Sequence, residues 1–357
     1  MKRTYLWLPA ALLLLSACSA SHDETVKTSA DDSPVPITLT ATAKTAVAGT
    51  RAVIDTDESV FQNSGYFLEG EQVDIFFEDY VEYQFYNEGG EDNDFTSYTQ
   101  PLVYTSDGAG NLTNTVPQYW PKKRHSLNVW GCYPSGIVYN PILNNDPSLN
   151  YDFTVETDQT TIANYRASDL MLGTPSSGPL NDANPLTQSF TMPHGTVGLT
   201  FTHMLSKIVI NLGRSDATDA DDPVVTNLPK ARVTILNTKP TTRFNVCAHS
   251  ITGTTVAATP IIARQTSDDT YNGLSVAAII IPQPVNPGQF IKVEVSNGTS
   301  VETFIFSLGS STTFQSGKVY TYNINVHKPG ILLTADITDW DDNAGANNAT
   351  GAGVLQP

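Results

Sequence analysis

The side chains best able to perform catalysis are His203, Ser206 and Lys207, which share one short segment of alternating apolar and polar residues. A histidine can activate a serine when a third group orients the histidine, or when the serine lies on a Gly-x-Ser-x-Gly elbow. The sequence contains no such elbow, and no paired base accompanies this segment. We therefore interpret His203 as a core or edge histidine bonded to backbone, and we predict that the protein is not an enzyme.

Two acidic segments are the candidates for a cation site. Residues 216–222 carry four aspartates, and residues 339–345 place Asp or Asn at the first, third and fifth positions of an EF-hand loop. The second segment has Ala344 where glycine is needed and Thr350 where the bidentate glutamate is needed, so it fails the motif. No His-x-x-x-His or Cys-x-x-Cys pair indicates zinc. We expect solvated acidic loops, with no metal and no cofactor.

The start of the chain predicts export. Met1-Lys2-Arg3 precedes an apolar run from Leu6 to Leu15, which is the pattern of a secretory signal and only about half of the roughly 20 residues that cross a bilayer. Leu15-Ser16-Ala17-Cys18 is similar to a bacterial lipobox, whose cysteine is lipidated and becomes the first mature residue. We expect residues 1–17 to be a signal peptide and residues 18–34 a flexible leader tethered by acyl chains such as palmitate. An ordinary signal peptide that ends near a cysteine is the alternative.

The charge balance limits the partners. The chain has 19 basic and 36 acidic residues, and removal of residues 1–17 takes away Lys2 and Arg3, which leaves 17 minus 36, or −19. This sign repels phosphate backbones, so we expect no nucleic-acid partner. It gives no attraction to anionic lipid either, so the acyl chains must supply the anchor. Asp23-Glu24, just past Cys18, resembles the acidic tag of lipoproteins sent to the outer face of the outer membrane.

The rest of the sequence predicts an all-β protein with few, short helices. Runs rich in Thr, Val, Ile and Tyr are separated by Gly, Pro, Asn and Asp, and no long stripe of 3.6-residue period is present. Regular turn signals are typical of β-sandwiches. A mature chain of this length suggests two domains, which we place at residues 52–188 and 189–340, followed by a tail at 341–357. Residues 140–150 and 173–188 are rich in Asn, Pro, Ser and Gly and are expected to be loops.

Cys132 and Cys247 are expected to be buried thiols that act as small apolar residues. The cell envelope is oxidising enough to pair them. A disulfide needs Cα atoms within about 7 Å, however, and we place the two cysteines in different domains. Their pairing stays open at this point.

Several motifs, in order along nearly the whole mature chain, resemble those of the fimbrillin-like lipoproteins that build type V pili. The motifs are the lipobox at Cys18, Thr50-Arg51-Ala52, Gly70-Glu71-Gln72-Val73, Tyr119-Trp120-Pro121, Asp169-Leu170-Met171, Leu199 to Lys207, Ile281-Pro282-Gln283, Gly317-Lys318-Val319-Tyr320 and Ile337-Thr338-Asp339-Trp340. The resemblance implies two tandem Greek-key β-sandwiches of transthyretin-like arrangement.

The resemblance also implies a structural and adhesive role in a cell-surface pilus. In this scheme the lipoprotein reaches the outer membrane, and an arginine-directed protease cuts between Arg51 and Ala52. The cut releases a first strand and cleavage loop at residues 35–51 and opens an apolar groove. Another pilin subunit fills the groove with its own strand, which gives a head-to-tail polymer. A host protein or glycan receptor is a further implied partner.

The donor strand has one strong candidate. Ile331, Leu333, Ala335 and Ile337 alternate as a donor requires, although the same segment could be the last strand of the second sandwich. The tail at 341–357 has Val354-Leu355 as its only strong apolar pair, which favours a tip, base or accessory subunit over a stalk subunit.

The competing hypothesis is a monomeric surface glycan-binding lipoprotein. The aromatic residues Tyr119, Trp120, Trp130 and Tyr133 could form a sugar-stacking platform, but strand alternation predicts that about half of them are buried. A cut after Arg51 distinguishes the two hypotheses, because a binding module has no use for the loss of its first strand.

Overall fold

The computed structural model describes a large part of the chain, all of it within one compact unit, Val35–Pro357. The described residues are 36–43, 65–79, 101–119, 126–136, 150–175, 180–181, 184–191, 196–214, 227–245, 250–252, 256–266, 274–296, 298–327 and 330–339. Among them, no helix has the length and apolar character needed to cross a membrane.

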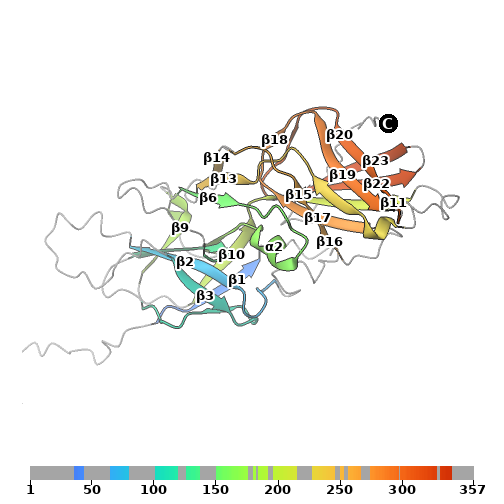
Figure 1. The fold of residues 1–357 in the computed structure, drawn as a ribbon. Coiled ribbons are helices and arrows are strands. Elements are labelled where there is room, and N and C mark those ends of the chain that lie inside the picture. The colour runs from blue at the N-terminus through green and yellow to red at the C-terminus, as the bar shows by residue number, and fades with distance from the viewer. Residues whose placement is uncertain are drawn as a thin grey trace, which may run out of the picture. The chain divides into compact units, whose positions relative to one another are not determined.

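The described residues are almost entirely β-strand, which confirms the expected all-β class (Figure 1). The helical elements among them are the short α2 (Ile162–Ala167) and the single 3-10 turn η2 (Leu228–Lys230). Thr161 caps α2, because its side-chain oxygen accepts a hydrogen bond from the backbone N–H of Asn164. Ser168 ends the helix, and Tyr165 is its buried residue.

The first half of the chain builds a nine-stranded sheet. Its order is β2 (Gln72–Asp79), β3 (Leu102–Ser106), β4 (Asn111–Thr113), β1 (Leu39–Ala43), β10 (Val197–His203), β7 (Met171–Pro175), β5 (Ser126–Tyr133), β9 (Asn184–Thr191) and β8 (Leu180–Asn181). Because β2 also pairs with β5, the strands from β2 through β1 and β10 to β5 form a closed ring.

Alternation along the ring strands separates two sets of buried side chains. On β2, Val73, Ile75 and Phe77 belong to one core, whereas Phe76 belongs to the other. The first core lies between the ring strands and contains Ile37, Leu39, Ala41, Phe67, Val73, Ile75, Phe77, Tyr104, Leu112, Val129, Tyr133, Met171, Val197, Leu199 and Phe201. Both faces of β2 are therefore buried.

The second half builds smaller sheets. The five-stranded sheet runs β16 (Arg264–Gln265), β17 (Leu274–Ile280), β11 (Ser206–Arg214), β22 (Lys318–His327) and β23 (Gly330–Asp339). The four-stranded sheet runs β15 (Ile261–Ile262), β12 (Arg232–Ile235), β19 (Gly288–Ser296) and β20 (Val301–Leu308). Two more sheets consist of β14 (Ser250–Thr252), β13 (Thr241–Asn245) and β6 (Asn150–Thr154), and of β18 (Pro284–Val285) and β21 (Thr312–Thr313).

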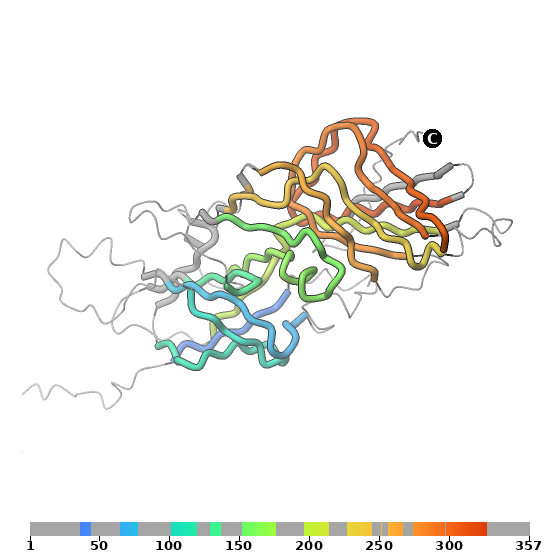
Figure 2. Tube along the Cα trace, viewed as in Figure 1, coloured from blue at the N-terminus to red at the C-terminus, as the bar shows by residue number. Residues whose placement is uncertain are grey.

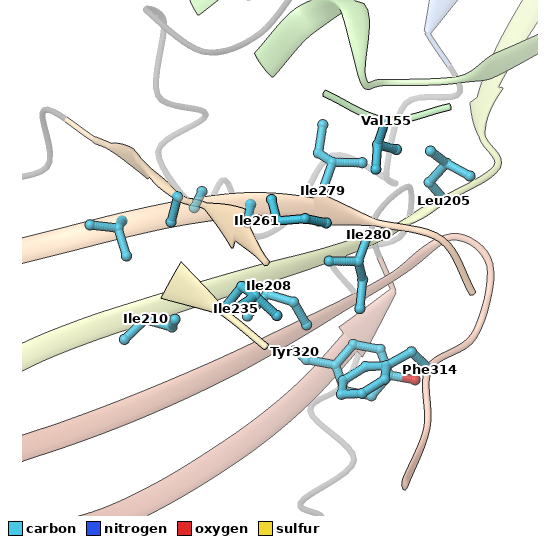
Figure 3. Close-up of a cluster of buried hydrophobic side chains, with 14 of the residues drawn as sticks. Val155, Leu205, Ile208, Ile210, Ile235, Ile261, Ile279, Ile280, Phe314 and Tyr320 are labelled. Atoms are coloured by element: carbon cyan, nitrogen blue, oxygen red, sulfur yellow. The ribbon is translucent and has the colours of Figure 1, made fainter. Parts of the chain in front are cut away.

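The second core is continuous across residues from both halves. It includes Ile208 and Ile210 of β11 and Ile279 and Ile280 of β17, and Figure 3 labels these four residues in the same buried cluster as Phe314 and Tyr320. Every residue of β17 is buried, as expected for a strand that reads as one apolar run. The same core takes in Phe76, Trp130 and Cys132 from the nine-stranded sheet. Cys132 is thus a buried thiol, whereas Cys247 lies outside the described residues.

The expected loop at residues 173–188 is wrong in part, because β7 extends to Pro175 and β8 and β9 follow. β9 pairs with β5 and β8 near the end of the sheet order, where a strand that is polar and contains Pro185 is tolerated. The next strand, β10, still belongs to the nine-stranded sheet, and the chain passes to the five-stranded sheet at Met204-Leu205. The domain limits given above stay a prediction.

Candidate functional site around the first strand

β1 is held on both sides. It runs parallel to β10, with Leu39 opposite Val197 and Ala43 opposite Phe201, and antiparallel to β4, with Thr40 opposite Asn111. Although β1 comes first in the chain and β10 comes far later, the two lie side by side in the same sheet (Figures 1 and 2). The first strand therefore fills an internal place in the ring.

Backbone hydrogen bonds continue this pairing beyond the strand. The N–H of Ile37 donates to the carbonyl of Gln118 at 2.8 Å, and the N–H of Ala43 donates to that of Gly65 at 2.7 Å. The N–H of Val197 donates to the carbonyl of Thr38 at 2.9 Å. Removal of residues 36–43 would leave these backbone groups without hydrogen-bond partners. Unpaired groups along a sheet edge favour pairing with another strand.

The inward side chains of β1, and of Ile37 just before it, are apolar. Ile37, Leu39 and Ala41 are 7%, 2% and 1% exposed and belong to the ring core, whereas Thr40 and Thr42 on the opposite face are half-buried. Burial of an Ile or Leu side chain is worth about 1.5–3 kcal/mol, so the strand is anchored mainly by two large side chains. Its loss would leave a slot shaped for Ile, Leu and Ala at alternate positions.

A compact turn forms one wall of this slot. Asp107 accepts hydrogen bonds from the backbone N–H groups of Ala109 and Asn111 and from the Asn111 side chain. These bonds, chiefly that of the Asn111 side chain, lower the pKa of the Asp107 carboxyl below its ordinary value. Gly110, at φ +101°, lies so close to the Tyr66 ring that a Cβ would approach a ring carbon to 2.8 Å. Its carbonyl accepts the N–H of Ala41 at 3.0 Å, which ties the turn to β1.

The segment proposed as donor forms β23. It pairs with β22 along its whole length, with Ile331 opposite Val326, Leu333 opposite Ile324, Ala335 opposite Tyr322 and Ile337 opposite Tyr320. Those four β22 residues are buried. In this structure the segment is the last strand of its own sheet, at the end of the order.

Polar side chains, including His203 and Asp169, lie where the chain passes from the nine-stranded sheet to the five-stranded sheet. His203 Nδ1 is 2.8 Å from Asp169 Oδ1, and the N–H of Met204 donates to the carbonyl of Leu170. The Ser206 hydroxyl donates to the carbonyl of Gln315, not to the histidine. The expected backbone partner of His203 is therefore a carboxylate instead, and Asp169 lies 34 residues away in the chain, where no local pattern indicates it. The arrangement does not support a serine nucleophile.

A second polar cluster consists of Glu71, Tyr133 and Arg166. Glu71 accepts hydrogen bonds from the Arg166 guanidinium and the Tyr133 hydroxyl, each at 3.1 Å. Burial, followed by the nearby Glu71 carboxylate, raises the pKa of Tyr133 well above its ordinary value, so the hydroxyl stays protonated and donates. Among the described residues, no group of three or more His, Cys, Asp or Glu side chains could hold a metal ion.

Comparison with known proteins decides the family, since the sequence model of the fimbrillin-like proteins matches residues 50–340. The chain belongs to the fimbrillin-like family. A curated relative, a candidate fimbrium subunit named Fim1C from Bacteroides uniformis, is 25% identical over 158 residues. That match covers 44% of this chain and about half, 49%, of the relative.

Solved structures share the fold of this fimbrillin-like chain. A candidate cell adhesion protein from Bacteroides ovatus aligns with a TM-score of 0.58 and 14% identity, over 86% of this chain and 98% of that one. Another, from Bacteroides uniformis, aligns with a TM-score of 0.54 and 18% identity, over 85% of this chain and 98% of that one. At these identities the likeness shows the fold.

The structure settles part of the aromatic platform considered for this fimbrillin-like protein. Trp130 stacks on Phe76, with ring centroids 3.6 Å apart, and is 3% exposed. Tyr133 is 4% exposed, while Tyr119 is 42% exposed. Trp120 lies outside the described residues. Trp130 and Tyr133 therefore belong to the cores and cannot stack on a sugar.

Some predicted site residues cannot be placed. Cys18, Arg51 and Ala52 lie outside the described residues, as do the acidic segment 216–222 and Trp340. Lipidation at Cys18 and cleavage between Arg51 and Ala52 therefore stay predictions.

Proposed function

We propose that this fimbrillin-like chain is a structural and adhesive subunit of a cell-surface type V pilus. It is exported as a lipoprotein, opened by an arginine-directed protease after Arg51, and assembled by strand exchange with other pilin subunits. The observation that carries this proposal is the place of β1, which is internal in the ring yet first in the chain, ahead of the predicted cleavage loop.

The physical chemistry of the slot supports assembly. Loss of β1 uncovers apolar side chains of β4 and β10 together with unpaired backbone groups, which one added strand satisfies at once. Donation by one subunit to the next is a heterologous contact that does not close, so it builds a filament.

The proposed domains are two tandem Greek-key β-sandwiches of transthyretin-like arrangement. Support comes from a feature that the two halves share. β1 runs parallel to β10 in the first half, and β11 runs parallel to β22 in the second, so each half pairs an early strand with a late one.

The proposed route to the surface begins at Cys18, with acyl chains, including palmitate, anchoring the leader in the outer membrane. The subunit leaves this anchor when the protease cuts after Arg51. It then acts as stalk, tip or accessory subunit, and a host protein or glycan is its receptor. The burial of Trp130 and Tyr133 weakens the alternative of a monomeric glycan-binding lipoprotein, since half of its platform is missing.

Limited proteolysis tests the proposal. The exported chain, residues 19–357, is treated with a low dose of a trypsin-like protease while its mass and its behaviour on denaturing gels are followed. A single cut after Arg51 and SDS-resistant ladders are expected, and Arg51→Ala should give neither. Unaltered fibres from Arg51→Ala would rule out cleavage at this residue, and clean cutting without ladders would indicate a tip or accessory subunit.

A further inference from the structure

Residues 150–170 lie between β5 and β7 in the chain but are hydrogen-bonded to the second half of the protein. β5 and β7 are neighbours in the nine-stranded sheet. β6 pairs instead with β13 of the three-stranded sheet over five residues, with Thr154 opposite Thr241 at one end (Figure 1). The chain thus leaves the ring, crosses to strands of the second half and returns to the ring at β7. We call residues 150–170 the strap.

The strap binds both larger sheets of the second half through backbone atoms. The N–H of Ile262 in β15 donates to the carbonyl of Thr157 at 2.8 Å, and the N–H of Gln159 donates to the carbonyl of Ile262 at 3.0 Å. The Gln159 amide also bonds both backbone groups of Ile279 in β17, each at 2.8 Å. β15 belongs to the four-stranded sheet and β17 to the five-stranded sheet. The strap therefore connects these two sheets to each other as well as to the ring.

Apolar side chains of the strap are part of the second core. They come from β6, from the residue after it, from α2 and from the residue before β7, and each is less than a tenth exposed. The four are Phe153, Val155, Tyr165 and Leu170. Figure 3 labels Val155 in the same cluster as Ile279 of β17. Release of the strap would return these side chains to water, which the hydrophobic effect opposes.

The last part of the strap is fastened to the ring. Arg166 of α2 donates a hydrogen bond to Glu71, just ahead of β2, at 3.1 Å, and the two side chains are 21% and 19% exposed. Asp169 Oδ1 lies 2.8 Å from His203 Nδ1 at the end of β10. Ion pairs that are mostly shielded from water are screened by salt less than exposed ones. The strap therefore has firm attachments on both sides.

The other passage between the halves, at Met204-Leu205, is held as well. The Ser316 hydroxyl donates to the carbonyl of Met204 at 2.7 Å, and the N–H of Gly317 donates to the carbonyl of Leu205 at 2.9 Å. Both donors lie just before β22, in the second half. The strap and this passage therefore join the halves at two separate places in the chain.

These contacts oppose separate unfolding of either half. Loss of the ring would free both ends of the strap, and its release would leave backbone groups of Ile262 and Ile279 unpaired and four core side chains in water. We infer that the strap joins the two halves into a single cooperative unit, so that a disturbance in the ring is felt in strands of the second half. In a pilus, a pull on one half would then reach the other through two connections. This consequence alone rests on the function proposed above.

Native-state hydrogen exchange, read by mass spectrometry on residues 19–357, tests the coupling. The probes are the slowest-exchanging amides of β10 in the ring and of β17 in the second half. Leu39→Ala removes a ring-core side chain of β1 and should speed exchange at both probes by the same factor, about thirtyfold or more. Ile210→Ala in the second core should likewise speed exchange at both probes. Faster exchange in the mutated half alone would overturn the inference.

A strap variant with a matched control assigns the coupling to the strap. The strap variant carries Gln159→Ala and Val155→Ala, which remove the two-point backbone contact and a core side chain that is 0% exposed. The control carries Gln283→Ala and Val285→Ala. Gln283 makes the same two-point contact with the backbone of Lys239, and Val285 is a buried residue of the second core, so both control changes lie within the second half.

Leu39→Ala is then introduced into both variants. In the control it should still speed exchange at β10 and β17 by the same factor, whereas in the strap variant it should speed exchange at β10 far more than at β17. Equal factors in the strap variant would show that the strap does not couple the halves. Should the strap variant not fold, Gln159→Ala alone takes its place. Filament formation by the parent chain after the cut at Arg51 reports the proposed function separately, because assembly requires the slot and not the coupling.

Discussion

Phe201 of β10 lies directly opposite Gly173 of β7, and its ring occupies the space that a side chain at Gly173 would need. A Cβ there would lie 2.5 Å from Cζ of Phe201. The same ring meets Phe67 edge-on, with centroids 4.9 Å apart, and stands opposite Ala43 of the first strand. The Phe201 ring therefore forms part of one wall of the slot, and it packs directly on the backbone of β7 at Gly173.

We predict that Gly173→Ala destabilises the protein by about 1–3 kcal/mol, because the new methyl group overpacks the ring core. Chemical denaturation, followed by the midpoint and slope of the transition, measures the change. Phe201→Leu in the same chain removes the clashing ring atoms, so the double variant should lose less than the sum of the two single losses. Strict additivity would contradict the contact.

The two faces of β1 should respond differently to truncation. Leu39→Ala removes a side chain that is 2% exposed and should cost about 2–5 kcal/mol in the intact chain. Thr40→Ala, on the opposite face of the same strand, should change the free energy of unfolding by about 0.5 kcal/mol or less. After the cut, Leu39→Ala should also speed release of the first strand, measured as the rate at which the fragment leaves on gel filtration. Equal effects of the two substitutions would contradict the register.

The Asp107 turn gives a pH dependence. Its hydrogen bonds lower the pKa of Asp107 below the ordinary value of 3.8, so the folded state holds the proton less tightly than the unfolded state. Its contribution to stability is therefore present above that ordinary value and is lost as pH falls through the lower folded value. Asp107→Ala should lower the melting temperature at neutral pH, and the difference from the parent should shrink as the pH falls below the ordinary value of 3.8. A difference that stays constant across this range would contradict the role of the carboxylate.

The His203–Asp169 pair is predicted to be structural. His203→Ala should lower stability without removing any chemistry, and a double-mutant cycle with Asp169→Ala should give a coupling of about 0.5–3 kcal/mol. Asp152 and Arg243 form an ion pair at 3.0 Å whose side chains are more than half exposed, so the same cycle there is a matched control with a smaller coupling. Native stability of His203→Ala would contradict the assignment.

Much of the fold could be predicted from alternation. The buried run of β17 and the alternating β1 and β10 follow from their residue types, because pleated strands send neighbours to opposite faces. The alternation does not show which strands pair with one another. Nothing local in residues 37–43 says that they pair with residues 197–201, since long-range pairing depends on the topology of the whole sheet.

The sequence also did not predict two buried glutamines whose amides take the backbone hydrogen bonds that a neighbouring strand would otherwise make. The Gln159 amide donates to the carbonyl of Ile279 and accepts a hydrogen bond from its N–H, both at 2.8 Å. This buried glutamine thus satisfies both backbone groups of one residue of β17. Gln283 does the same for Lys239. A lone glutamine in a sequence looks like a surface residue, and only the tertiary contact reveals a two-point clamp.

The fate of the first strand tests the central claim most directly. The exported chain is cut after Arg51, and the amount of the released N-terminal fragment is measured by mass spectrometry in the remaining monomers and in purified filaments. We predict roughly one fragment per chain in freshly cut monomers and almost none in filaments, because a neighbouring strand then fills each slot. Filaments that retain one fragment for every subunit would contradict strand exchange.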